Sequence, residues 1–280
     1  MKAILFLILV TFTIEAESYE SQWRSYPACK IGRLQSPIAL NLSDSTYNNT
    51  FSFVYQGYLP QASKILESGE SYTAKSADFS AGYINFAKGG VIKQYEFIRA
   101  EIYEGLHPVE NDDRSVSAAE LELHLVHKKL LGFKTNKNQY RTIQEANNYL
   151  VIVLRYNTSD CVNCTYDDGL LSQLTSSNNI DLSNYPIFQD KRAYYYEGSF
   201  IYTPCDEDVN YYVVKDLFQA DSSDLQALIE KGLASVEKPA YSFGRPIYRN
   251  FMNYTESLDG YSIRPNVLVI LVALLICFGI

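Results

Sequence analysis

The sequence has few of the residues that nucleic-acid-binding surfaces and most metal sites require. Only 3 of its 280 residues are His, and 24 Lys and Arg stand against 32 Asp and Glu, which gives a formal net charge of −8. The chain lacks the basic face that nucleic acids and anionic membranes bind, so no nucleic-acid partner is expected. It contains no Gly-x-Ser-x-Gly, His-Glu-x-x-His or phosphate-loop motif. No period of about 20–50 residues repeats, which excludes solenoids and propellers.

What the sequence has instead is apolar and aromatic side chains: 47% of the residues are hydrophobic and 24 are Tyr. With only 20% charged residues, this is the composition of a globular chain with one large core. Runs rich in Val, Ile, Phe and Tyr predict strands at 51–55, 82–86, 94–103, 121–126, 150–156, 199–203 and 210–214. Helices are predicted at 222–232, where Leu225 and Leu228 share a face, and at 169–174.

Residues 1–17 have the pattern of a secretory signal peptide. Lys2 precedes the apolar stretch 3–12, and Ala16 provides a small residue at the cleavage site. A mitochondrial presequence would be rich in Arg, whereas the first Arg of this chain is Arg24. The chain is therefore expected to enter the secretory pathway.

The C-terminal segment, residues 257–280, ends in the apolar run 267–280. As a helix this run would span about 21 Å, which is short of the ~30 Å hydrocarbon core of a bilayer. A short apolar tail behind a polar spacer is typical of a glycosylphosphatidylinositol (GPI) anchor signal, with Ser257, Asp259 and Gly260 as candidate attachment residues. A short, tilted membrane helix is the alternative. Either anchor would hold the single predicted domain, residues 18–256, at the extracellular face of the plasma membrane.

Cysteines and glycosylation sequons agree with an oxidising compartment. Outside the tail the chain has four cysteines: Cys29, Cys161, Cys164 and Cys205. Four cysteines allow three pairings, among which these spacings do not choose. Five Asn-x-Ser/Thr sequons predict glycosylated surface positions: Asn41, Asn48, Asn157, Asn163 and Asn253.

Several segments of the body follow one another in the order and spacing of a known family. They are Cys29-Lys-Ile-Gly-Arg-Leu-Gln-Ser-Pro-Ile38, Tyr95-Glu-Phe-Ile-Arg-Ala-Glu-Ile-Tyr103, Ala119-Glu-Leu-Glu-Leu-His-Leu-Val-His127, Leu150-Val-Ile-Val-Leu154, Tyr194-Tyr-Tyr-Glu-Gly-Ser-Phe-Ile-Tyr-Thr-Pro-Cys205 and Arg245-Pro246. Through these segments, over about residues 20–250, the chain resembles the α-class carbonic anhydrases. The resemblance implies an α+β, mostly β domain with a central, twisted, mainly antiparallel sheet of about ten strands and short surface helices.

The resemblance also implies a disulfide between Cys29 and Cys205, as in secreted members of the family. The pair Cys161 and Cys164 is not part of the family pattern. A small loop disulfide is favoured there over a zinc half-site, because no second Cys pair is available to complete such a site.

In this family three neutral imidazoles bind one zinc ion, which makes hydroxide available near neutral pH. Two of the three come from a His-x-His pair, since side chains two apart on a strand share a face. The resemblance places these two positions at Glu101 and Tyr103, and only the third ligand, His124, is retained. Tyr ligates poorly while it is protonated, so a Glu101–Tyr103–His124 zinc site is a weak alternative.

The other two histidines are not expected to compensate. His127 lies three residues after His124 and so points to the opposite face of a strand. His107 lies in a Gly-Leu-His-Pro loop, where we expect a solvated side chain. A three-histidine site therefore cannot be assembled from this sequence in this fold.

The residues that assist zinc in the family are also replaced. By the resemblance, Ile201 stands where a threonine orients the zinc hydroxide, and Glu70 stands where a histidine shuttles protons. Leu106 aligns with the acidic partner of that threonine, although Glu110 leaves the register open. Glu122 matches the carboxylate that orients the third ligand, so it is expected to pair with His124.

These losses predict a cell-surface pseudoenzyme without a cofactor that acts as a protein-binding or adhesion module. Its partner would be an extracellular protein or a neutral ligand, because the acidic chain disfavours polyanions. The alternative is an enzyme: a residual zinc-dependent carbonic anhydrase, or a hydrolase that uses carboxylates such as Glu70, Glu101 and Glu122 in the same cleft.

Overall fold

The structure is a computed structural model that describes residues 29, 32–56, 61–68, 71–76, 83–111, 113–130, 148–158, 165–166, 170–176, 179–180, 191–201, 205–230 and 245–252. Residues 1–250 form one compact unit, and residues 251–280 cluster separately, with only Phe251 and Met252 described. The predicted signal peptide and C-terminal tail lie outside the described residues.

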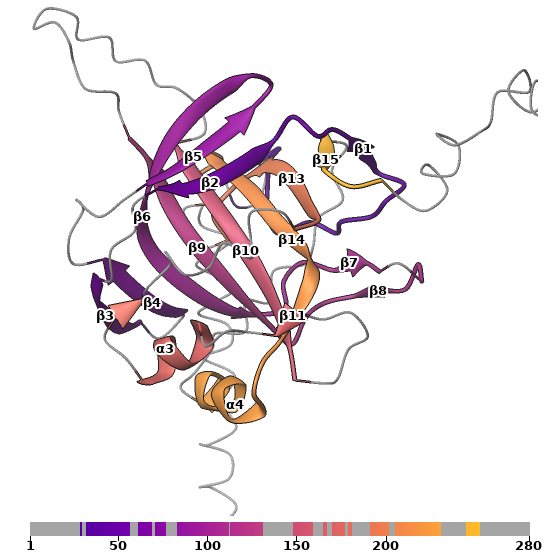
Figure 1. Cartoon of the computed structure of the whole chain (residues 1–280). Coiled ribbons are helices and arrows are strands. Elements are labelled where there is room, and N and C mark those ends of the chain that lie inside the picture. The colour runs from indigo at the N-terminus through magenta and orange to yellow at the C-terminus, as the bar shows by residue number, and fades with distance from the viewer. Residues whose placement is uncertain are drawn as a thin grey trace, which may run out of the picture. The chain divides into compact units, whose positions relative to one another are not determined.

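The described part of the first unit is built almost entirely of strands (Figure 1). The strands of its first half are β1 Ser45–Tyr47, β2 Ser52–Gln56, β3 Gln61–Ser68, β4 Ser71–Ser76, β5 Tyr83–Lys88, β6 Val91–Glu104, β7 Val109–Glu110, β8 Val116–Ser117 and β9 Leu121–Lys129. Those of the second half are β10 Tyr149–Asn157, β11 Thr165–Tyr166, β12 Asn179–Ile180, β13 Ala193–Gly198, β14 Val209–Gln219 and β15 Ile247–Arg249. The two helices are α3 Leu170–Ser176 and α4 Ser222–Glu230.

Within the described residues, thirteen strands join into one sheet. Its main path runs β1-β15-β13-β14-β10-β9-β6-β4-β3-β12, with β2, β5 and β11 attached at the side, while β7 and β8 form a separate pair. Most neighbours are antiparallel, and the parallel ones are β1–β15, β10–β14 and β11–β14. The predicted fold class is therefore confirmed.

Strand β6 joins β5 to β9 and carries a bulge. Its residues 91–96 pair with β5, which in turn pairs with β2, and its residues 95–104 pair with β9. The register with β9 shifts between Phe97 and Arg99, which lie opposite His127 and Val126 respectively. Since neighbouring residues of β9 point to opposite faces, the bulge moves Arg99 to the face opposite Phe97.

The main hydrophobic core lies on the Phe97 side of the sheet. The residue types are those that favour buried strands, and β9 and β10 are buried along most of their length on both faces. Members of this core from the central strands are Phe97, Ala100, Ile102, Leu123, Leu125, Ile152 and Leu154. The other face of the same strands is therefore left for the residues of the candidate site.

Both predicted helices and all the predicted strands but one lie where they were predicted. The strand predicted at 199–203 is wrong over its described part, 199–201, because β13 already ends at Gly198. There Ser199 N donates to Ser36 Oγ (3.1 Å) and Phe200 N donates to the carbonyl oxygen of Asp206 (3.1 Å). These bonds turn the backbone out of the sheet, so Phe200 and Ile201 lie in a loop although their residue types favour strands.

Candidate functional site

Strands β6 and β9 bring the three expected ligand positions together on one face of the sheet. Glu101 lies opposite His124, and Tyr103 lies opposite Glu122. The ring centroids of Tyr103 and His124 are 4.9 Å apart. All four side chains are buried, so this face is enclosed by protein.

Three alternate residues of β6, namely Arg99, Glu101 and Tyr103, form a hydrogen-bonded chain that includes the two expected ligand positions Glu101 and Tyr103. Arg99 Nε donates a short hydrogen bond to Glu101 Oε1, and Tyr103 OH donates to Glu101 Oε2 at 3.0 Å. The Arg99 guanidinium also lies 5.5 Å from the ring centroid of Phe200. Both oxygens of Glu101 therefore hold a donor, and its charge is balanced by an adjacent cation.

Glu122 is the centre of a second hydrogen-bonded group. Its Oε1 accepts the backbone N–H groups of Leu106 (3.0 Å) and His107 (2.7 Å). Its Oε2 lies 2.7 Å from His107 Nδ1 and 3.0 Å from His124 Nε2. Burial by itself raises the pKa of Glu122, but attraction to His107 and the hydrogen bonds from both imidazoles hold that pKa well below its usual range. We therefore treat Glu122 as an ionised acceptor of four N–H donors.

The ionised carboxylate fixes the tautomers of the two histidines. His107 must carry its proton on Nδ1, which leaves Nε2 to accept from Tyr196 OH at 2.7 Å. His124 must donate from Nε2, which leaves the lone pair on Nδ1. His107, Glu122 and His124 lie close enough together to hold a metal ion, but the hydrogen bonds above already use both Glu122 oxygens and both His107 nitrogens.

The expectation that His107 is solvated is wrong, because its side chain is fully buried. The backbone of Leu106 and His107 folds inward to reach Glu122. Gly105 permits this path, since a Cβ there would lie 1.9 Å from the carbonyl oxygen of Ala119. Burial is the main cause of the lowered pKa of His107, and attraction to Glu122 opposes that shift.

Apolar side chains surround the remaining part of the site. Tyr103, Leu106 and Ile201 form a buried cluster. Glu110, the alternative to Leu106, lies elsewhere, with Oε2 accepting the Leu42 N–H at 2.7 Å. Neither Leu106 nor Ile201 has a side-chain hydrogen-bonding group, so this corner cannot orient a hydroxide or water through them.

Arg155 adds a second buried cation that sequence analysis missed. It lies opposite Glu122 in the register of β10 with β9 and is fully buried. Its guanidinium donates to the carbonyl oxygens of Lys215 (2.9 Å) and Ser117 (3.1 Å). Burial lowers its pKa, and the Glu122 charge opposes that shift. Each buried carboxylate of this face thus has an arginine beside it, namely Arg99 for Glu101 and Arg155 for Glu122.

A comparison of the sequence with models of known protein families finds one match. A sequence model described as eukaryotic-type carbonic anhydrase covers residues 18–255. The chain belongs to the eukaryotic-type carbonic anhydrase family. No curated protein sequence matches the chain.

Solved structures with the same fold include two α-carbonic anhydrases. The enzyme from Photobacterium profundum has 16% identity, a TM-score of 0.57 and coverage of 82% of this chain and 95% of its own. That from Thermovibrio ammonificans, in complex with sulfanilamide, has 19% identity, a TM-score of 0.57 and coverage of 80% and 90%. Dioscorin complexed with ascorbate has 17% identity, a TM-score of 0.57 and coverage of 80% and 88%. At these identities the likeness concerns the fold.

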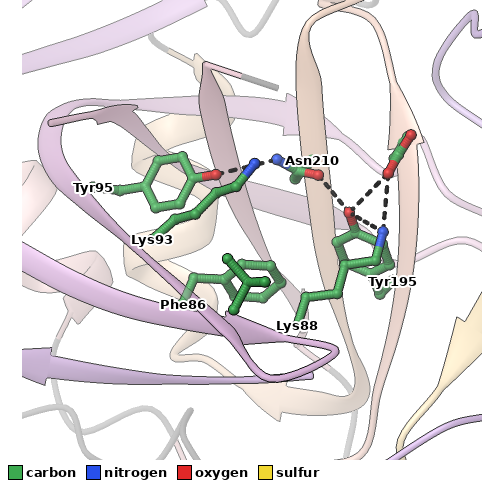
Figure 2. A pocket seen from close by; sticks show the side chains of 8 residues that line it. Phe86, Lys88, Lys93, Tyr95, Tyr195 and Asn210 are labelled. Atoms are coloured by element: carbon green, nitrogen blue, oxygen red, sulfur yellow. Dashed lines mark hydrogen bonds and ion pairs between the residues drawn. The ribbon is translucent and has the colours of Figure 1, made fainter. Parts of the chain in front are cut away.

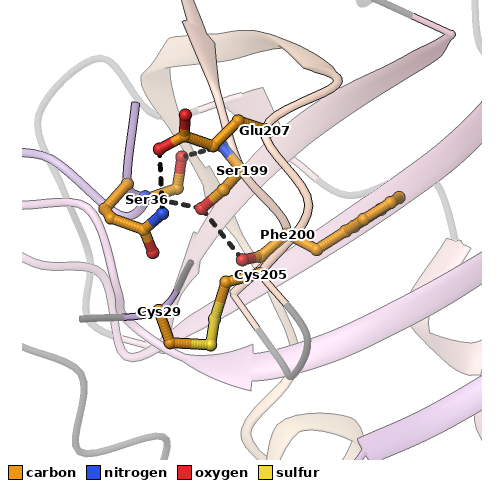
Figure 3. Close-up of a disulfide and its surroundings, with 7 residues drawn as sticks. Cys29, Ser36, Ser199, Phe200, Cys205 and Glu207 are labelled. Atoms are coloured by element: carbon orange, nitrogen blue, oxygen red, sulfur yellow. Dashed lines mark hydrogen bonds between the residues drawn. A yellow bond between two sulfur atoms is a disulfide. The ribbon is translucent and has the colours of Figure 1, made fainter. Parts of the chain in front are cut away.

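The carbonic anhydrase domain contains the disulfide that the resemblance implies, between Cys29 and Cys205 (Figure 3). Beside it Ser36 N donates to Ser199 Oγ (3.1 Å), and Ser199 N donates back to Ser36 Oγ (3.1 Å). Leu34 N donates to Glu207 Oε1 at 2.6 Å. The N-terminal segment is thus held to the loop that carries Phe200 and Ile201.

The remaining sequence predictions concern residues that the structure describes only in part. Three sequon asparagines, Asn41, Asn48 and Asn157, are described and partly exposed. The predicted shuttle position Glu70, the pair Cys161 and Cys164, and the sequons at Asn163 and Asn253 lie outside the described residues. No helix among the described residues is long and apolar enough to span a membrane.

Proposed function

We propose that the chain is a carbonic anhydrase family member without carbonic anhydrase activity that serves as a binding module at the outer cell surface. The observation that carries this proposal is the Arg99–Glu101–Tyr103 chain at the first two ligand positions. A zinc ion there would need three neutral imidazoles and an open fourth position. The residues present offer one imidazole, a carboxylate already bound by two donors, and a protonated phenol. They do not fit catalytic zinc.

The electrostatics of the site also oppose a divalent cation. Arg99 lies beside Glu101, and Arg155 lies opposite Glu122 in the strand register. Both arginines are permanently charged, so they oppose the attraction of a metal ion to these two carboxylates. Zinc would have to displace Arg99 from Glu101 and would then face that guanidinium across a buried, low-dielectric space.

The same contacts argue against a hydrolase based on these carboxylates. A general acid or base must reach the proton that it transfers. Glu122 is fully buried and accepts four hydrogen bonds, and Glu101 is buried with both oxygens occupied. Both carboxylates are buried, and each of their oxygens already accepts at least one hydrogen bond.

The test is the zinc content and CO2 hydration rate of the full chain expressed in a secretory host. An active α-carbonic anhydrase from the same host is the matched control. We expect well below one zinc per chain and no rate above buffer. One zinc per chain together with hydration activity would overturn the proposal and would support the residual carbonic anhydrase.

The cell-surface part of the proposal rests on the two ends of the sequence. The signal peptide pattern of residues 1–17 and the apolar tail 267–280 support secretion followed by anchoring through a GPI lipid. Treatment of intact expressing cells with a phosphatidylinositol-specific phospholipase C should release the protein into the medium. Retention at the surface would instead indicate a membrane helix, and intracellular protein alone would refute the localisation.

A further inference from the structure

A cavity of about 220 Å³ lies between the β5–β6 hairpin and strands β13 and β14 (Figure 2). Its walls are Phe86, Lys88, Val91, Lys93, Tyr95, Tyr195, Glu197 and Asn210. None of these residues is a ligand position or contributes to the Glu122 group.

This cavity is on the opposite side of β13 and β14 from the candidate zinc site. Tyr196 bonds to His107, and Tyr211 packs 5.7 Å from His107 between ring centroids. Their chain neighbours Tyr195 and Asn210 must therefore point the other way, since successive strand residues alternate between faces. The cavity is thus structurally independent of the site described above.

A connected set of hydrogen bonds forms the floor of the cavity. Lys88 Nζ donates to Tyr195 OH (3.0 Å) and Glu197 Oε1 (2.9 Å), and Tyr195 OH makes a short bond to Asn210 Oδ1. Asn210 Nδ2 reaches Tyr95 OH at 3.4 Å. Burial raises the pKa of Tyr95 to about 12 and also raises that of Tyr195, so both phenols stay protonated. The one carboxylate of the lining, Glu197, is already paired with Lys88.

Lys93 is the charged group of this cavity for which the described residues provide no counterion. It is partly buried, and within the described residues it makes no hydrogen bond or ion pair. The pKa of Lys129 is lowered first by burial and then by repulsion from the nearby Lys93 charge, while attraction to Asp208 raises it. With Lys88 and Lys93 against Glu197, the lining carries one net positive charge although the whole chain is acidic.

The other side of the cavity is apolar and partly open. The Phe86 ring is stacked on Tyr195 with centroids 5.7 Å apart, and Val91 at the rim is 58% exposed. A cavity of about 150 Å³ holds one benzene ring. The space here therefore suits a single ring with a small acidic group.

We propose that this cavity binds a small organic carboxylate, about one ring in size, whose acid group pairs with the Lys93 ammonium while its ring covers Val91 and Phe86. Charge complementarity selects the acid, and the exposed apolar rim selects the ring. The acidic surface of the whole chain disfavours polyanions but does not prevent one local ion pair.

Benzoate is the probe, with benzamide as its neutral isostere and acetate as its head group alone. Titrations of the full chain, followed by ligand-observed NMR, should give an affinity for benzoate about tenfold or more above that for either comparison compound, since a hydrogen bond to a charged group contributes about 1.5–3 kcal/mol. Equal binding of benzoate and benzamide would overturn the proposal.

Three variants separate the named contacts from general effects. Lys93→Gln should remove the preference for benzoate over benzamide, and Val91→Ser should weaken both ring compounds by a few fold. Lys128→Gln, the same charge change at an exposed residue outside the lining, should bind benzoate like the unmodified chain. Unchanged binding by Lys93→Gln, in a variant whose thermal unfolding matches the parent, would refute the site. The result does not depend on the zinc content, so failure here leaves the pseudoenzyme proposal intact.

Discussion

At the scale of single residues, Arg99 is the counterion of Glu101 at the face of the candidate zinc site. A histidine at position 101 would add a metal ligand but would also remove the carboxylate that neutralises the guanidinium. Arginine cannot be discharged at accessible pH, so the unpaired cation would persist next to the metal. Arg99 and Glu101 therefore have to be changed together for zinc to bind at this face of β6.

We predict that the double variant Glu101→His, Tyr103→His binds zinc only weakly. Adding Arg99→Gln to it should strengthen zinc binding at least about tenfold, because like charges placed together cost several kcal/mol. Competition with a chromogenic chelator measures the dissociation constants. Arg33→Gln, at an exposed arginine, is the matched control and should have no effect. CO2 hydration should stay slow in all variants, since Leu106 and Ile201 offer no hydrogen bond to a zinc-bound hydroxide. Equal zinc affinity with and without Arg99 would contradict this explanation.

His127 makes stability depend on pH. Its buried imidazole bonds to the Leu150 carbonyl oxygen at 3.3 Å, and burial lowers its pKa to about 3. Below the unfolded-state pKa of about 6.5 the unfolded chain binds a proton that the folded chain does not, so stability is lost as pH falls from about 6.5 towards 3. We expect this one group to remove about 1.4 kcal/mol per pH unit in that window.

Urea unfolding of the full chain at pH 7, 6 and 5 measures this slope. His127→Gln should reduce this slope by about one proton. The part that remains includes the contribution of His107, whose pKa is also lowered by burial. Glu122 is present in both proteins, so its contribution near pH 5 cancels in the comparison. An unchanged slope in His127→Gln would show that the imidazole charges without unfolding.

At the scale of elements, two features of the strands position the site. The bulge in β6 turns Arg99, Glu101 and Tyr103 to one face, and the end of β13 lies against the N-terminal segment. Gly198 ends β13 where a Cβ would lie 2.2 Å from Ser36 Oγ and 2.8 Å from the Tyr196 ring. Since Tyr196 also bonds to His107, this glycine couples the packing of the strand end to the Glu122 group.

We predict that Gly198→Ala destabilises the domain by about 1–3 kcal/mol, the usual cost of overpacking. Thermal and urea unfolding measure the change. In a Ser36→Ala background the cost should be smaller, because the nearest atom is removed. The same cost in both backgrounds would show that Ser36 is not the source of the strain.

At the scale of the whole molecule, long-range links hold the N-terminal segment around Cys29 and Ser36 to the loop that carries Phe200 and Ile201. The Cys29–Cys205 disulfide spans 176 residues, and Arg245 donates to the carbonyl oxygens of Gln35 and Glu197 on either side of the Ser36–Ser199 pair. These contacts keep Phe200 and Ile201 in place above Tyr103. Closing so long a loop restricts the unfolded chain strongly.

We predict that Cys29→Ser together with Cys205→Ser lowers the free energy of unfolding by about 3–5 kcal/mol. Cys277→Ser, which changes a cysteine of the tail, should leave it unchanged. Equilibrium urea unfolding under non-reducing conditions compares the three proteins. A loss below about 1 kcal/mol would mean that the noncovalent contacts alone hold the segment.

The mostly β class and the family segments could be predicted from the sequence. The assignment of Glu101, Tyr103, Leu106 and Ile201 to replaced zinc-site positions also came from the sequence and stays a prediction. Those inferences depend on alternation along single strands and on the order of short strings, which are local. The burial of His107, the bulge at Phe97 and the Arg155–Glu122 pairing were decided only by the tertiary structure. They depend on register between strands and on the path of a loop, and both are set by packing and hydrogen bonds between residues far apart in the chain. Arg99 lies between the two cases: alternation alone places it beside Glu101, but only the folded site makes it the counterion.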